Sequence, residues 1–183
     1  RKSVDELIKL RQSGLKIIYL GVETGNPELL KKIHKGVTYE QMVEASHRVK
    51  QAGIALSVTV ILGLGGMEKS MEHAIDTAKI LTDIDPDYTG ALTLMLVPGT
   101  DLYSDYLSGR FVLPDKFGFI RELYIIIANS NFTNCFFTSN HASNYLPVKV
   151  RLPQEKEKIL AMINSVIDTK DLTRIRPEYM RGL

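Results

Sequence analysis

The chain has 183 residues, of which 44% are hydrophobic and 24% are charged, and it contains one cysteine and four histidines. These are ordinary values for a globular domain, so they exclude a disordered, collagenous or low-complexity chain. The 23 basic and 21 acidic side chains give a net charge of +2, which provides no electrostatic signal for nucleic acid or an anionic membrane. A single cysteine excludes an internal disulfide and leaves little material for a metal site made by this chain alone.

Membrane and export signals are absent from the sequence. The longest apolar run, 54–64, is shorter than the ~20 residues that span a bilayer, and Ser57, Thr59 and Gly63 interrupt it. The opening residues are charged and amphipathic rather than apolar, so we expect no signal peptide. We therefore expect a cytoplasmic protein without membrane contact. Because the first residue is not Met, we also expect a piece of a longer protein or a processed chain.

Short apolar runs alternate with amphipathic helices along the chain, which is the pattern of parallel βα units. The spacing predicts a helix over 4–12 and a strand over 15–22, whose nearly continuous apolar run suits burial on both faces. The next helix begins at Asn26-Pro27-Glu28. Asn is a good helix cap, Pro suits the first helical position, and Glu favours the positive end of the helix dipole.

The same alternation continues in the remainder of the chain. Thr38 and Gln41 fit a capping box, and the helix that they begin ends at Gly53. A second strand over 54–62 leads into the glycine-rich loop 63–66. We predict further strands over 88–97 and 135–139 and further helices over about 69–82, 101–107, 115–128 and 153–167.

These elements predict an α/β fold. A complete (βα)8 barrel takes ~250 residues, and the four predicted parallel strands are too few to close one. We therefore expect residues 1–145 to form an incomplete parallel (βα) barrel, or an open sheet that pairs with something else. Residues 146–183 are expected to form a C-terminal helix followed by a polar tail that lies on the surface or frays.

Residues at the ends of the predicted strands are the first candidates for a site, because function in parallel α/β proteins lies where strands end and loops begin. Glu23 follows the first strand, where a carboxylate is costly unless it is paired. It either accepts hydrogen bonds from an ammonium or ribose hydroxyl of a ligand, or forms a salt bridge with a neighbouring Lys or Arg. The glycines of 63–66 either let a ligand approach the backbone or form a tight turn.

A polar segment follows the fourth predicted strand. Within it His141 could move a proton near neutral pH, so it is the candidate catalytic residue. Asn140, Ser143 and Asn144 are candidates for orienting a polar substrate. The alternative is an Asx-rich turn that caps its own backbone. Cys135, just before this segment, is expected to be a small buried hydrophobic residue.

Several segments, taken in order, resemble the radical S-adenosylmethionine (radical SAM) superfamily. The matching stretches are Leu20-Gly21-Val22-Glu23-Thr24-Gly25-Asn26, Leu29-Leu30-Lys31-Lys32-Ile33, Lys35-Gly36-Val37-Thr38, Ile61-Leu62-Gly63-Leu64-Gly65-Gly66 and Pro98-Gly99-Thr100-Asp101-Leu102. The first three look like the segment of that family on the fourth barrel strand, the next is similar to its fifth-strand segment, and the last resembles the PGTPL that follows its sixth strand. The resemblance is densest between residues 14 and 102.

The resemblance implies roughly the second half of a TIM-like (βα)6 barrel with a C-terminal helical extension. It implies that Glu23, with Thr24 beside it, contacts the amino or ribose part of S-adenosylmethionine, and that Ile61 and Gly63 lie against the adenine. It further implies a [4Fe–4S] cluster that cleaves this cofactor reductively. The resulting 5′-deoxyadenosyl radical abstracts hydrogen from a small-molecule or otherwise unknown substrate.

Two features depart from the family pattern. The fifth-strand pattern GxIxGxxE is met only at Ile61 and Gly63, because Thr59 stands at its first Gly and Gly66 at its Glu. The CxxxCxxC loop that holds the cluster does not occur in these 183 residues. We expect it in an upstream half-barrel of the same protein, and we expect the present segment alone to be inactive. The alternative is a paralogue without a cluster.

Two other functions remain open from the sequence. One is a non-radical barrel enzyme that uses Glu23 and His141 as acid and base, with an anion bound at 63–66. The other is a non-catalytic module that binds a nucleotide or a partner subunit through an open sheet edge.

Overall fold

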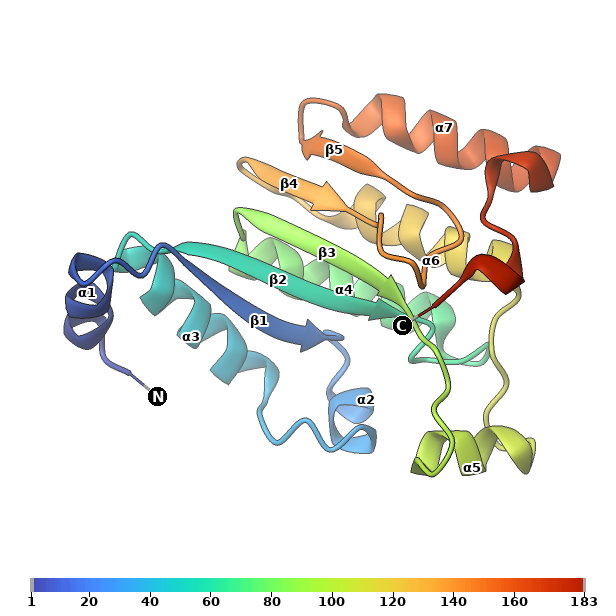
Figure 1. Cartoon of the computed structure of the whole chain (residues 1–183), viewed down its shortest axis with the longest axis horizontal. Coiled ribbons are helices and arrows are strands. Elements are labelled where there is room, and N and C mark those ends of the chain that lie inside the picture. The colour runs from blue at the N-terminus through green and yellow to red at the C-terminus, as the bar shows by residue number, and fades with distance from the viewer. Residues whose placement is uncertain (1, 183) are drawn as a thin grey trace.

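The computed structural model describes residues 2–182 and shows a single five-stranded sheet (Figure 1). The strands lie in chain order, and they are β1 (Ile17–Glu23), β2 (Ala55–Leu62), β3 (Tyr88–Thr93), β4 (Cys135–Thr138) and β5 (Lys149–Leu152). Strands β1 to β4 are parallel to one another, and β5 is antiparallel to β4. The predicted α/β fold with a parallel sheet is therefore confirmed. The third strand ends at Thr93, earlier than predicted.

Helices connect the parallel strands, and α3, α4 and α6 lie behind the sheet in Figure 1. The helices are α1 (Val4–Gln12), α2 (Pro27–Lys32), α3 (Tyr39–Gln51), α4 (Ser70–Ile84), α5 (Asp101–Leu107), α6 (Lys116–Asn129) and α7 (Lys156–Thr169). Two helix starts follow the predicted chemistry. The Asn26 side chain accepts hydrogen bonds from the amides of Glu28 and Leu29, and Thr38 with Gln41 forms a capping box.

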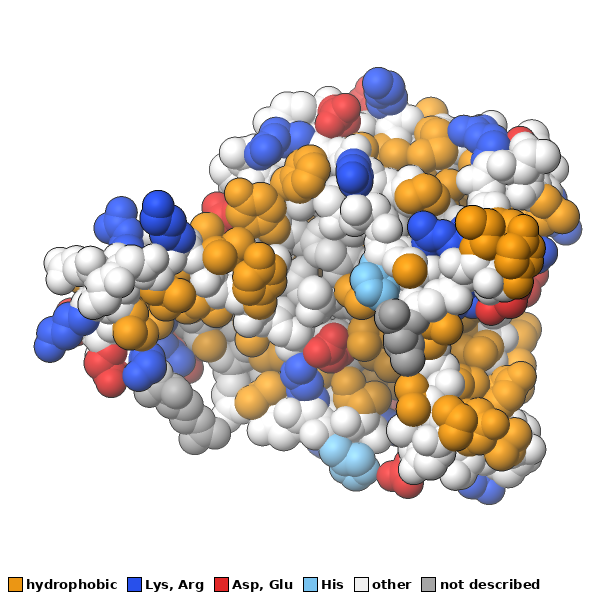
Figure 2. Space-filling model, viewed as in Figure 1, with side chains coloured by type: hydrophobic (Ala, Val, Ile, Leu, Met, Phe, Trp, Pro, Cys, Tyr) orange, Lys and Arg blue, Asp and Glu red, His pale blue; other side chains and the backbone are white. Residues whose placement is uncertain are grey.

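The two faces of the sheet differ in burial. Along β2 the buried residues Leu56, Val58, Val60 and Leu62 alternate with half-buried ones, so one face packs on the helices. We call the opposite side the open face; it carries Tyr19, Gly21, Ser57, Thr59, Ile61, Tyr88, Gly90 and Phe136. Figure 2 shows it from the front, with a mostly white centre of backbone and uncharged polar side chains. Burial on both faces, which the apolar run of the first strand predicted, is not found within residues 2–182.

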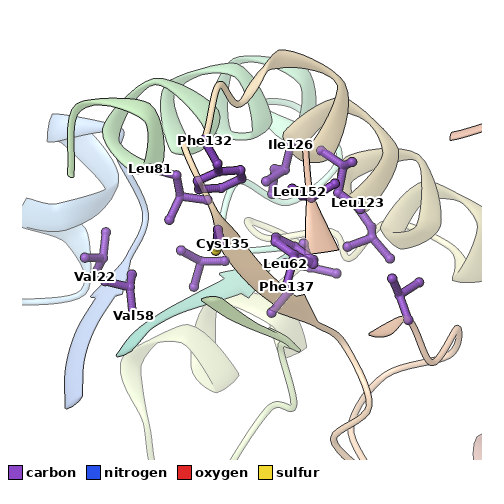
Figure 3. Close-up of a cluster of buried hydrophobic side chains, with 14 of the residues drawn as sticks. Val22, Val58, Leu62, Leu81, Leu123, Ile126, Phe132, Cys135, Phe137 and Leu152 are labelled. Atoms are coloured by element: carbon purple, nitrogen blue, oxygen red, sulfur yellow. The ribbon is translucent and has the colours of Figure 1, made fainter. Parts of the chain in front are cut away.

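The hydrophobic core lies between the sheet and its helices. Figure 3 shows Leu62, Phe137 and Leu123 of β2, β4 and α6 close together, with Val22 of β1 beside Val58 at the other side of the same core. Burying such a side chain stabilises the fold by about 1.5–3 kcal/mol. Cys135 lies fully buried in the same core, as expected, and burial raises the pKa of its thiol to about 12. It is therefore a neutral, packed side chain.

Strand β5 was not predicted from the sequence. Its residues alternate between exposed Lys149 and Arg151 and buried Val150 and Leu152, which is the pattern of a half-buried antiparallel strand. Residues 146–183 thus contribute β5 to the sheet and α7 to the core formed with the preceding residues.

The two edges of the sheet differ. Within residues 2–182 each edge strand has one strand neighbour: β5 is antiparallel to β4 at one edge, and β1 is parallel to β2 at the other. A parallel strand with one unpaired edge exposes backbone donors and acceptors that another strand can use. Among the described residues, no helix is both long and apolar enough to cross a membrane.

Candidate functional site

The two strand ends singled out in the sequence lie next to each other. Strand β1 is paired in parallel with β2, with Gly21 opposite Thr59 and Glu23 opposite Val60. The segments that follow both strands therefore begin at the same end of the sheet, where the carboxyl ends of the strands lie. Glu23 and Gly63 consequently belong to one region of the molecule, as the sequence predicted.

Glu23 has an unusual backbone conformation. Its φ is 65°, in the left-handed region, and the pairing register shifts between Gly21 and Glu23, which marks a β-bulge. The bulge brings the carboxylate back over Gly21, so that a Cβ added to Gly21 would overlap Glu23 Oε1. Gly21 is thus required for the carboxylate to lie on the open face.

The carboxylate of Glu23 has one cationic partner. Lys35 Nζ donates a hydrogen bond to Glu23 Oε1 at 2.9 Å, and the two side chains are 22% and 21% exposed. The salt bridge considered from the sequence is therefore formed. The second oxygen of Glu23 has no hydrogen-bond partner within residues 2–182, so the carboxylate keeps acceptor capacity for a ligand.

Thr24 lies on the other side of the bulge. Its side chain is fully buried, its hydroxyl lies 2.9 Å from His73 Nδ1, and it accepts a hydrogen bond from the amide of Asn26. The hydroxyl thus stabilises the turn that follows β1, on the helix side of the sheet. Thr24 lies on the same side as the buried Val22, opposite to Glu23, and its contact with the cofactor stays a prediction.

His73 connects the two strand ends under the sheet. Its Nε2 lies 3.0 Å from the carbonyl oxygen of Ile61, which can only accept, so Nε2 carries the proton. Nδ1 is then the acceptor for the hydroxyl of Thr24. Burial lowers the pKa of His73 to about 4, so the ring is neutral at physiological pH.

The end of β2 is held by a second buried group, Glu122 of α6. The amide of Gly63 donates to Glu122 Oε2 at 2.6 Å, and the hydroxyl of Ser70 lies 2.6 Å from Oε1. Burial raises the pKa of Glu122 to about 7. Gly63 itself has a φ of 90°, and a Cβ there would overlap the ring of Phe119, so no other residue type fits.

His73 and Glu122 were not predicted from the sequence as members of the site. The sequence feature that could have revealed Glu122 is its position on the apolar face of a helix. Its buried neighbours Phe119, Leu123 and Ile126 lie three residues before, one after and four after it, which is helical spacing for one face. A carboxylate on such a face needs a specific partner.

The open face can accommodate a ligand with both polar and flat apolar parts. Beside Glu23 its floor has small residues, and a Cβ on Gly90 would lie 3.7 Å from Thr59 Cγ2, in ordinary contact. The half-buried Ile61 offers an apolar surface. The carboxylate acceptor of Glu23 and this apolar surface fit an amino or hydroxyl group together with a flat ring. Within residues 2–182 no group of three or more His, Cys, Asp or Glu could hold a metal ion, so this segment does not fit an iron–sulfur cluster.

Ser143 and Asn144 hold the end of β3. The Ser143 hydroxyl accepts a hydrogen bond from the amide of Thr93, and Asn144 Oδ1 accepts one from the hydroxyl of Thr93 at 2.9 Å. The Asn144 amide group donates to the carbonyl of Ala91. Both side chains are buried and brace the backbone of β3, and the role predicted for them toward a substrate stays a prediction.

His141 and Asn140 are the exposed members of that segment. His141 Nδ1 lies 3.0 Å from the hydroxyl of Ser143, which is a local turn contact of the kind considered as the alternative. Within residues 2–182 no hydrogen bond joins His141 to Glu23, the pair required by the non-radical acid–base alternative. His141 remains accessible, so its predicted role toward a substrate stays a prediction.

Arginines of the C-terminal tail hold residues 141–144 in place through hydrogen bonds that the sequence did not predict. One guanidinium nitrogen of Arg176 donates to the carbonyls of His141, Ala142 and Asn144 at 2.7–2.9 Å. Arg181 donates to the carbonyl of Ser143 at 2.7 Å. The tail, drawn in red, crosses near the carboxyl ends of the strands in Figure 1. It is therefore attached through its arginines instead of fraying.

Comparison with known proteins finds a family model and several relatives to which this chain is similar. The family model described as the Radical SAM superfamily matches residues 2–78. The heme chaperone HemW of Bacillus subtilis is 28% identical over 62% of this chain and 30% of its own length. A tRNA uridine(34) acetyltransferase of Methanocaldococcus infernus is 28% identical over 60% of this chain and 20% of its own length.

The fold is similar to that of a solved archaeal structure. Methanocaldococcus infernus Elp3, with its N-terminus deleted, superposes with a TM-score of 0.61 and 18% identity over 92% of this chain and 39% of that chain. This likeness shows the shared (βα) barrel architecture. The chain spans less than a third of the length of the two curated relatives. The Radical SAM superfamily model thus matches the part of the chain, residues 2–78, that contains the ends of β1 and β2.

Proposed function

We propose that this chain is the portion of a radical SAM enzyme that holds the adenosyl part of S-adenosylmethionine, at the carboxyl ends of β1 and β2. The observation that carries the proposal is the carboxylate of Glu23, which lies on the open face next to the strand end that bears Ile61 and Gly63. When bound, S-adenosylmethionine and a [4Fe–4S] cluster supply a 5′-deoxyadenosyl radical for hydrogen abstraction.

Each residue has a distinct part in this proposal. Glu23 accepts hydrogen bonds from the amino or ribose part of the cofactor, while Lys35 holds the carboxylate in place from one side. The side chain of Ile61 provides an apolar surface for the adenine. Gly63 lets the ring approach the backbone at a position where a larger residue would meet Phe119.

The cluster belongs to another part of the protein in this proposal. Residues 2–182 offer no ligand set for it, so its cysteines would come from an upstream half-barrel that pairs along the unpaired edge of β1. The segment alone would then be inactive, because the reductive cleavage requires the cluster.

The substrate follows less directly from the chain. The two curated relatives are named for heme and for tRNA, so members of this family differ in what they handle. We propose a small molecule, because the near-neutral charge of this segment provides no footprint for nucleic acid. His141 and Asn140, exposed after β4, are the proposed contacts, and a cytoplasmic location is proposed with them.

Anaerobic reconstitution of the intact protein tests the function. The proposal expects the visible absorbance of an iron–sulfur cluster and, with a reductant and S-adenosylmethionine, formation of 5′-deoxyadenosine. A reconstituted protein that shows neither would contradict it. Turnover of a substrate in air without iron would instead favour the non-radical enzyme.

A further inference from the structure

Two titratable side chains lie fully buried directly behind the proposed adenosyl site. Both His73 on α4 and Glu122 on α6 have no solvent-exposed surface. Burying a polar or charged group is costly unless its hydrogen bonds are made. Each of these side chains makes its bonds to the backbone or side chains at the ends of β1 and β2.

Glu122 is not part of a structural ion pair. Within residues 2–182 no Lys or Arg pairs with it; the nearest basic atom is His73 Nε2, 3.9 Å away, whose proton is already donated to Ile61. The ring is neutral, so this approach provides no compensating charge. The carboxyl group is therefore maintained in an apolar helix face by its bonds to Gly63 and Ser70 alone.

The amide of Gly63 needs such an acceptor. Pairing between β2 and β3 ends at Leu62 and Thr93, so the sheet offers this amide no partner. A buried amide without an acceptor is strongly unfavourable. Glu122 takes the hydrogen bond at 2.6 Å, while the ring of Phe119 leaves no room for a side chain at Gly63. Contacts with Glu122 and Phe119 of α6, on the helix side of the sheet, therefore fix the position of Gly63.

His73 acts on the neighbouring backbone in the same way. It binds the carbonyl of Ile61 through Nε2 and the hydroxyl of Thr24, one residue after Glu23, through Nδ1. A single rigid ring thereby couples the end of β1 to the end of β2. The two buried groups together fix the backbone positions from which Glu23, Ile61 and Gly63 face a ligand.

We infer that Glu122 and His73 are positioning residues for the cofactor, which hold the ends of β1 and β2 at the spacing that the adenosyl group requires. This inference rests on the proposed function and extends it to residues that do not touch the ligand. It explains why the carboxyl group of Glu122 occupies an otherwise apolar helix face.

Binding of S-adenosylhomocysteine to the intact protein, measured by calorimetry, tests the inference. Glu122→Ala leaves the Gly63 amide without an acceptor and is expected to raise the dissociation constant about tenfold, which corresponds to about 1.4 kcal/mol. Glu122→Gln keeps an acceptor for Gly63 and can donate to Ser70, so its affinity should stay within about twofold of wild type. Hydrogen exchange at the Gly63 amide should accelerate in the Ala variant and not in the Gln variant.

Ser130→Ala is the matched control. Ser130 is also buried, at the end of α6, and its hydroxyl donates to the carbonyl of Ile126, away from the strand ends. Its removal tests general loosening of the helix and is expected to leave the affinity unchanged. If Glu122→Ala does not fold, Glu122→Asp replaces it, because it retracts the carboxylate by one methylene; the same loss of affinity is expected.

The outcomes separate the inference from the function on which it rests. Wild-type affinity in the Ala or Asp variant, an equal loss in the Gln variant, or an equal loss in Ser130→Ala would each overturn the positioning role while the proposed function stands. A wild-type protein that does not bind S-adenosylhomocysteine would overturn both.

Discussion

The carboxylate of Glu23 occupies the space that a side chain at Gly21 would need, since a Cβ on Gly21 would overlap Glu23 Oε1. The two residues are linked by the β-bulge that ends the pairing of β1 with β2. A glycine in this strand thus has a specific purpose, which is to let an acid lie flat on the open face of the sheet.

Gly21→Ala should displace that carboxylate. The added methyl group forces the Glu23 side chain away from Lys35 and from the proposed ligand position, so we expect at least a tenfold weaker affinity for S-adenosylhomocysteine, about 1.4 kcal/mol. Calorimetry on the intact protein measures this. Gly182→Ala is the control, because a Cβ there would have no heavy atom of the described residues within 4 Å. Equal effects of the two substitutions would argue against a special role for the Gly21–Glu23 pair.

Comparing variants of Glu23 and Lys35 separates ligand binding from salt-bridge formation. Glu23→Gln removes a charged acceptor and should weaken cofactor binding by about 1.5–3 kcal/mol. Lys35→Met removes only the partly exposed partner and should change the stability by less than about 1 kcal/mol. We expect the affinity loss to be much larger for Glu23→Gln. If both variants bind the cofactor like wild type, Glu23 serves the salt bridge alone.

The buried acid Glu122 should leave a signature in the pH dependence of stability. Burial raises its pKa from 4.5 to about 7, so the folded state keeps a proton that the unfolded state loses, and stability falls as the pH rises through this range. His73 has the opposite effect, because its pKa is lowered from 6.5 to about 4 and stability therefore rises with pH over that interval. The two effects oppose each other where the ranges overlap.

Glu122→Gln isolates the acidic contribution. The amide cannot ionise, so the variant should gain stability relative to wild type as the pH is raised from 4.5 to 7, by as much as about 3 kcal/mol. Thermal unfolding midpoints of both proteins across this range measure the difference. A difference that is the same at every pH would show that Glu122 does not take up a proton in the folded state.

Arg176 should be important for the segment that carries His141. Its guanidinium group donates to three carbonyls, and Arg176→Gln would leave some of them without partners, at a cost of about 1–3 kcal/mol. We expect a lower unfolding temperature and faster hydrogen exchange of the amides of residues 141–145. Arg174→Gln is the control, since Arg174 makes a single 3.4 Å contact with Ser165. Unchanged exchange in Arg176→Gln would mean that the tail does not restrain this segment.

Local chemistry in the sequence was sufficient to predict much of the fold. The cap at Asn26, the capping box at Thr38 and the parallel order of the first strands follow from residue types and periodicity. Strand β5 was missed because four residues provide too few alternations to distinguish a strand from a loop. Its pairing with β4 depends on a partner that the alternation pattern does not specify.

The candidate site was only partly accessible from the sequence. The proximity of Glu23 and Gly63 follows from parallel strand order, but the bulge between Gly21 and Glu23 is not marked by any residue pattern. Polar residues after a strand can face a ligand or brace a neighbouring strand, and the sequence does not show that Asn144 binds Thr93 of β3. The bond between Glu122 and Gly63 joins residues 59 positions apart, which local periodicity does not reveal.

Amide hydrogen exchange of the intact protein with and without S-adenosylmethionine tests the central claim most directly. If the ends of β1 and β2 form the adenosyl site, residues 21–24 and 61–65 should both become protected when the cofactor binds. Binding that protects neither segment, or only one of them, would contradict the account.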